Sequence, residues 1–163
     1  MTKKDFVLNF YPQVLRLNKF YKKKYGKSLP VYGVLAHMAV ESGWATSTKM
    51  VKANALFGIK ATPNWSGKVY STATHEVYDN NRVCINAQFR AYDSTYQCIK
   101  DYFELLYKNP RYSKVVGCTL GKYGQYLYDC GYMTDPTAPQ TIYSIAKDLH
   151  DNYNYKELKK RGY

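Results

Sequence analysis

Two carboxylic acids in this sequence lie in surroundings that should give them different proton affinities. Glu41 directly follows the uncharged segment VLAHMAV, whereas Glu76 lies in the polar, β-branched segment VYSTATHEVY. A carboxyl in an apolar wall keeps its proton to a higher pH and can donate it, while a carboxyl among polar groups stays ionised. The pair therefore suggests that Glu41 is a general acid. Glu76 would be a second group acting as base, nucleophile or electrostatic support.

Glycoside hydrolysis requires a pair of carboxyls with these roles, because one protonates the leaving oxygen while the other assists at the anomeric centre. The other two glutamates, Glu104 and Glu157, lie in charged segments, and we expect them to be solvated. The pattern alone leaves a second interpretation open, since a glutamate at a helix end is also commonly paired with an arginine.

The residue types that usually hold metals are not grouped. The chain has three histidines and four cysteines: His37, His75, His150, Cys84, Cys98, Cys118 and Cys130. No CxxC pair occurs, and the histidines lie at no metal-ligand spacing. We expect neither a metal nor a cofactor. We favour free thiols over disulfides, because a chain of 163 residues can fold around its own core.

Net charge and aromatic content narrow the class of partner. The formal charge is +12, which favours a polyanion such as nucleic acid or an anionic cell envelope. Solubility alone would also account for this charge. Nineteen tyrosines contribute to an aromatic content of 17%, and their flat faces suit sugar rings, bases or ordinary packing.

Apolar spacing predicts a mainly helical chain that forms one catalytic domain over residues 1–163. We expect helices over about 5–25, 30–42, 94–108 and 120–129, and a last helix from about Asp135. Pro12 should break or start a helix, Gly43 should end the second one, and Asp93 or Ser94 should cap the third.

One segment has a different pattern. Residues 64–90 contain two runs rich in Val, Ile, Thr and Tyr, separated by the turn residues DNN. These runs predict a small β-hairpin lobe with its turn near residues 79–81.

The N-terminus and the hydropathy bear on localisation. No apolar run reaches the length of a membrane-spanning helix, and the first residues do not resemble a secretory signal peptide. For a protein that acts outside a cell, we expect phage-type release from a host cytoplasm or excision of this domain from a longer secreted protein.

Several motifs resemble, in order, those of the glucosaminidase family of peptidoglycan hydrolases, whose members include autolysins, a flagellar muralytic domain and phage lysins. The motifs are ESGWATS (residues 41–47), NALFGIK (54–60), THEVYDNN (74–81), FRAYDS (89–94), LLYKNPRY (105–112) and DCGYMTDP (129–136). Ala45 and Ala55 depart from the family pattern, which has glycine and asparagine there. The resemblance covers about residues 11–152.

This resemblance implies a lysozyme-like fold, in which a helical lobe and a small β-lobe flank a substrate groove. It also implies an endo-acting enzyme that cuts glycan strands of peptidoglycan after N-acetylglucosamine, at the bacterial cell wall. Carried over by motif, Glu41, Glu76 and Tyr132 are the expected catalytic residues. The expected substrate contacts are Trp44, Asn54 and Phe57.

Two alternatives remain. A muramidase on the same scaffold would cut the other glycosidic bond. A non-catalytic module that binds glycan or nucleic acid would not need both Glu41 and Glu76. We expect a monomer that acts on peptidoglycan and an anionic wall, with no nucleic-acid partner and no membrane span.

Overall fold

The computed structural model describes all residues, 1–163, and consists mostly of helices. In chain order the elements are α1 (Lys3–Tyr25), α2 (Val31–Ser42), α3 (Thr48–Ala53), β1 (Val69–Tyr78), β2 (Asn81–Arg90), α4 (Thr95–Lys108), the 3₁₀ helix η1 (Pro110–Tyr112), α5 (Leu120–Asp129), α6 (Ala138–Asn152) and α7 (Tyr155–Lys160). Strands β1 and β2 form the one sheet. The expectation of a mainly helical chain with a small β-hairpin is therefore confirmed. No helix combines the length and apolar character that a bilayer crossing requires.

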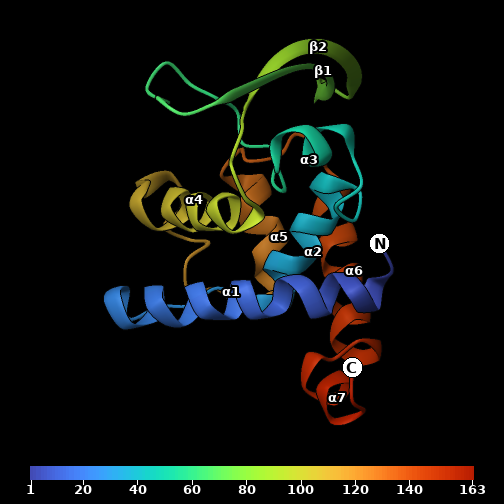
Figure 1. Ribbon diagram of the computed structural model, residues 1–163. Coiled ribbons are helices and arrows are strands. Elements are labelled where there is room, and N and C mark those ends of the chain that lie inside the picture. Colours follow the sequence, from blue (N-terminus) through green and yellow to red (C-terminus); the bar gives the residue numbers. More distant parts are fainter.

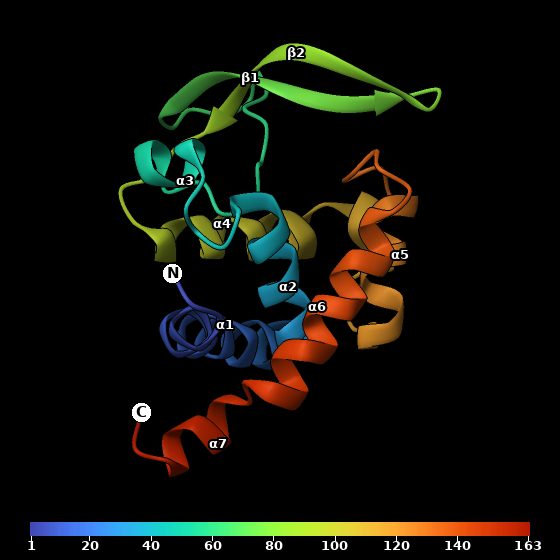
Figure 2. The same cartoon turned by 90° about the vertical axis from the view of Figure 1, so that its right-hand side faces the viewer.

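Helix α2 lies at the centre of the molecule. It contacts α1, α5 and α6, and most of its side chains are buried. Figures 1 and 2 show α1 and the hairpin on opposite sides of α2. A residue at the C-terminal end of α2 therefore faces the hairpin.

Helix α1 passes through Pro12 without a break, so the predicted interruption there is wrong. Pro12 lies on the exposed face, between the buried residues Tyr11 and Val14. Proline removes one backbone donor, and on the solvent side water can satisfy the carbonyl that loses its partner. The apolar face toward α2 stays continuous.

The predicted end of α2 at Gly43 is confirmed, and the turn after it is tight. Gly43, Trp44 and Ala45 have φ values of 56°, 58° and 61°, all in the left-handed region. The Trp44 amide donates to Ala39 O at 2.9 Å, and the Ser42 hydroxyl accepts from the Ala45 amide at 2.9 Å. These bonds hold the chain reversal that follows Glu41.

The hairpin turn lies where the sequence predicted it. β1 and β2 pair antiparallel from Val69↔Arg90 to Tyr78↔Asn81. The two turn residues, Asp79 and Asn80, both have positive φ, as a type I′ turn requires. Phe89 is the only buried residue of the two strands, so the hairpin has no core of its own.

The later helices agree with the sequence pattern except at their ends. The Ser94 hydroxyl caps α4, as expected. Helix α6 begins at Ala138 rather than near Asp135, because the Asp135 carboxylate accepts from the Thr137 amide at 2.8 Å and forms a turn. Helices α3 and α7 were not predicted, since six residues are too few to show a helical period.

Candidate active site

A groove of about 960 Å³ runs between the hairpin and the helical part of the molecule, and both candidate carboxylates line it. Glu41 reaches it from the last turn of α2, and Glu76 from β1. Tyr132, in the segment between α5 and α6, also lines it. The structure therefore brings all three predicted catalytic residues to one surface.

Glu41 is partly open to the groove, with 27% of its side chain exposed. Gly58 lies directly opposite, with φ +60°, and a Cβ at that position would lie 2.9 Å from Glu41 Oε2. A larger residue would therefore displace the carboxyl and would also strain the backbone. The glycine of NALFGIK, which lines the groove, leaves the space that Oε2 occupies.

Glu76 is held by groups from outside its own strand. Lys60 Nζ lies 2.7 Å from Oε1, and the Thr134 hydroxyl donates to Oε2 at 3.0 Å. The same hydroxyl accepts from the Val77 amide at 3.0 Å. Since Thr134 lies between α5 and α6, these bonds join the hairpin to the helical part across the groove. Sequence reasoning missed both Lys60 and Thr134.

Lys60 is itself positioned by the sheet. It forms a β-bridge with Phe89, and the Ala61 amide donates to Gln88 O at 2.8 Å. The segment that follows Gly58 therefore runs along the outer edge of β2 and brings its lysine to Glu76.

Tyr132 links two groove segments. Its hydroxyl donates to Phe57 O at 2.9 Å. Burial, and after it the nearby Glu41 carboxylate, raises the pKa of Tyr132 well above its ordinary value. The phenol therefore stays protonated at neutral pH, and its one hydrogen is committed to Phe57 O, so it holds the groove wall and is not a base.

The three expected substrate contacts, Trp44, Asn54 and Phe57, are not among the residues that line the groove. Trp44 packs edge-on against Phe6, with ring centroids 5.3 Å apart. Phe57 is fully buried, and the Asn54 side chain donates to Tyr92 O at 2.9 Å. The structure therefore gives none of the three a place on the groove surface.

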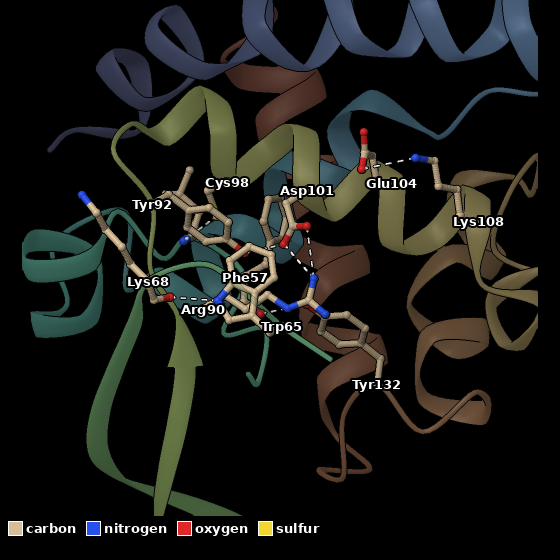
Figure 3. A network of polar contacts seen from close by, with 11 residues as sticks. Phe57, Trp65, Lys68, Arg90, Tyr92, Cys98, Asp101, Glu104, Lys108 and Tyr132 are labelled. Atoms are coloured by element: carbon tan, nitrogen blue, oxygen red, sulfur yellow. Dashed lines mark hydrogen bonds and ion pairs between the residues drawn. The ribbon is translucent and has the colours of Figure 1, made fainter. Parts of the chain in front are cut away.

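A polar network anchors the base of the hairpin to α4 (Figure 3). One guanidinium nitrogen of Arg90, the last residue of β2, donates to both carboxylate oxygens of Asp101 at 3.1 and 3.0 Å, and the Tyr92 hydroxyl donates to the same carboxylate at 2.6 Å. The Arg90 guanidinium also lies 4.6 Å from the centre of the Trp65 ring. One end of the hairpin is therefore fixed to the helical part, and its far end is held through Thr134.

The groove is rich in cationic groups. Five basic residues line it: Lys49, Lys60, Arg82, Arg90 and Arg111. Three acidic residues line it as well, namely Glu41, Glu76 and Asp135. No group of three or more His, Cys, Asp or Glu side chains is gathered as metal ligands would be, and the four cysteines are unpaired. The groove therefore holds carboxyls that could take part in acid–base chemistry, and they lie among an excess of basic residues.

Known proteins can be aligned with this sequence over most of its length. Peptidoglycan hydrolase FlgJ of Escherichia coli strain K12 is 38% identical over 127 residues. Exo-glucosaminidase LytG of Bacillus subtilis strain 168 is 30% identical over 130 residues. The alignments cover 74% and 76% of this chain but only 40% and 45% of those proteins, so the chain spans less than half of their length.

Solved structures share the fold. The crystal structure of a peptidoglycan hydrolase mutant from Sphingomonas sp. A1 has a TM-score of 0.79 and 31% identity, and the match covers 96% of this chain and 99% of that one. The catalytic domain of the autolysin Auto from Listeria monocytogenes, at 24% identity and a TM-score of 0.71, shows the same fold. The predicted lysozyme-like architecture is therefore confirmed.

A sequence model described as "Glucosaminidase: Mannosyl-glycoprotein endo-beta-N-acetylglucosaminidase" matches residues 15–151, which include all three candidate catalytic residues. The resemblance seen in the motifs is thereby confirmed, and the chain belongs to the glucosaminidase family.

Proposed function

We propose that this chain is a glycoside hydrolase that cuts peptidoglycan glycan strands at the β-1,4 bond following N-acetylglucosamine, acting within strands. The observation that carries the proposal is the presence of Glu41 and Glu76 in one groove, on opposite walls. Membership of the glucosaminidase family and the names of its relatives support the substrate class. The two carboxylates also argue against a module that only binds glycan.

Glu41 is the general acid in this proposal. Its Oε2 lies beside Gly58, which lines the groove, and there it would protonate the glycosidic oxygen as the bond breaks. The oxocarbenium-like charge that develops on the sugar would be stabilised by the negative charge of Glu76.

Glu76 is suited to one of two roles. As a base it would activate a water molecule, and the reaction would invert the anomeric centre. As an electrostatic support it would assist attack by the 2-acetamido group of the substrate, and the reaction would retain the configuration. Lys60 and Thr134 hold the carboxylate oriented for either role. We assign Tyr132 to the catalytic group as a protonated phenol on the groove wall, whose oxygen can still accept a hydrogen bond while its hydrogen is donated to Phe57 O.

Charge supports an anionic polymer as the partner. The cationic groove suits the carboxylates of peptidoglycan, and the exposed Lys22, Lys23 and Lys24 at the end of α1 add a basic surface far from the hairpin. We propose that one catalytic domain, residues 1–163, acts as a monomer at an anionic cell wall, after phage-type release or as part of a secreted protein.

Analysis of the new reducing ends tests the proposal. Purified peptidoglycan is digested, the ends are reduced with borohydride, and the sugar alcohol is identified after full hydrolysis. Glucosaminitol supports the proposed bond, whereas muramicitol as the main product would make the protein a muramidase. Release of short fragments from chain ends only would indicate an exo-acting enzyme. No new reducing ends would contradict hydrolysis altogether.

A further inference from the structure

A buried histidine lies behind the proposed acid and has no role in the mechanism above. His37 precedes Glu41 by one helical turn on α2, and its side chain is completely buried. His37 Nε2 lies 3.6 Å from Glu41 Oε1 and has no hydrogen-bond partner, while Nδ1 lies 3.0 Å from the Tyr102 hydroxyl. The imidazole ring therefore lies between the buried Tyr102 hydroxyl and the Glu41 carboxyl.

The hydrogen bonds continue inward from His37, because the hydroxyl of Tyr102 lies 2.6 Å from the hydroxyl of Tyr123. His37, Tyr102 and Tyr123 thus form a chain of hydrogen bonds. Both tyrosines are fully buried, and burial raises the pKa of each, so both keep their protons at neutral pH. The other titratable group packed on the imidazole is Tyr132, at 4.9 Å between ring centroids, and it is also a protonated phenol. Glu41 is thus the one acid that faces His37.

Counting hydrogen-bond donors selects the direction of donation along these three residues. If the Tyr123 hydroxyl donates to Tyr102 and Tyr102 donates to His37 Nδ1, a neutral ring carries its proton on Nε2 and points it at Glu41. In the reverse direction the Tyr123 hydrogen has no acceptor, and a bare Nε2 faces the carboxylate. A buried donor or acceptor without a partner costs free energy, so the first direction is favoured.

We propose that His37 is a positioning residue for Glu41: its Nε2–H donates to Oε1 and leaves Oε2, beside the groove-lining Gly58, to carry the proton given to the glycosidic oxygen. The contact at 3.6 Å is longer than a hydrogen bond, and it would tighten when substrate closes the groove. The inference rests on the proposed function, because it assumes that Glu41 is the acid. It adds which oxygen of Glu41 acts and which group orients it.

The tautomer can be measured without any activity assay. Nitrogen-15 NMR of labelled imidazoles distinguishes a protonated ring nitrogen from a bare one, and loss of signals in His37→Gln assigns the ring. We expect a protonated Nε2 and a bare Nδ1 at neutral pH. A proton on Nδ1, alone or together with one on Nε2, would overturn the proposed direction of the chain.

Variants test whether the ring orients the acid. In His37→Gln, the amide can still donate to Glu41 and accept from Tyr102, so we expect most of the turnover rate to remain. In His37→Leu, we expect the turnover rate to fall roughly 10- to 100-fold with an unchanged half-saturation concentration, because the acid is misplaced rather than the substrate. His150→Gln, a change at an exposed histidine, is the matched control and should leave the rate unchanged.

A second variant covers the case in which His37→Leu fails to fold. Tyr102→Phe keeps the ring that stacks on Phe57 at 3.9 Å but removes the hydroxyl that sets the tautomer. We expect a mixed tautomer and a slower turnover. An unchanged tautomer and rate in this variant, or equal losses in His37→Gln and His37→Leu, would overturn the proposal. If instead Glu41→Gln were fully active, the proposed function would fail while the NMR result would still stand.

Discussion

The two walls of the groove hold their carboxylates in different ways. Glu41 ends a helix in which eight of the twelve residues are buried, so its backbone is fixed by the core. Glu76 lies on a hairpin with a single buried residue, Phe89, and a two-stranded ribbon is marginally stable by itself. Its position depends on Lys60, Thr134 and the Arg90–Asp101 pair.

This difference suggests a division of roles. A proton donor must be placed accurately, and a buried helix provides that accuracy. The hairpin side of the groove has to move to admit a polymer. A hairpin held by a few polar contacts can open without unfolding the core. Four substitutions can break or sharpen this comparison.

The largest effect is expected for Glu41→Gln, which keeps the shape but removes the transferable proton. Wall-lysis rate should fall by about 10²–10⁴-fold, the usual contribution of general acid catalysis. Melting temperature should hardly change, because the carboxyl makes no hydrogen bond in the structure. Glu104→Gln, on the exposed part of α4, is the control and should remain active. A near wild-type rate for Glu41→Gln would show that this glutamate is structural.

Glu76→Gln should also lose much activity, with little loss of thermal stability, because its partners lie at the groove surface and its strand contains no buried residue. Lysis assays and melting curves of the two glutamate variants can be compared directly. A residual rate well above that of Glu41→Gln would point to assistance by the substrate's acetamido group. Full activity would remove Glu76 from the site.

Thr134→Val tests the tether across the groove. The change removes the hydroxyl that bonds the Val77 amide and Glu76, a contact worth about 1–2 kcal/mol, so we expect a roughly tenfold slower rate. Hydrogen exchange at the Val77 amide should accelerate. Thr72→Val, the same change at a half-buried position of β1 that does not line the groove, should alter neither measurement. Unchanged exchange in Thr134→Val would show that the far end of the hairpin is held by other contacts.

The smallest effect is expected on the helical side. Ala45 has φ 61°, where an alanine is strained, so Ala45→Gly should stabilise the fold by roughly 1 kcal/mol. Ala53→Gly, in a helix, should destabilise it by about 0.5–1 kcal/mol. Thermal melts of the two variants should shift in opposite directions. A lower melting temperature for Ala45→Gly would mean that the methyl group makes a contact that outweighs the strain.

Local signals predicted most elements because their causes lie within a few residues. The Ser94 cap, the glycine that ends α2 and the two turn residues of the hairpin each act on the adjacent backbone. Pro12 misled the prediction, because its effect depends on which face of the helix meets water, and that is a tertiary property.

The candidate site divides in the same way. The sequence by itself singled out Glu41 and Glu76 through their contrasting neighbours, and its ordered motifs indicated the family. Only the tertiary structure decided that Lys60 and Thr134 hold Glu76, that His37 lies next to Glu41, and that Trp44, Asn54 and Phe57 do not line the groove. These contacts join segments far apart in the chain or depend on which way a side chain points. Local spacing carries no information about either, because packing of the helices around α2 determines both.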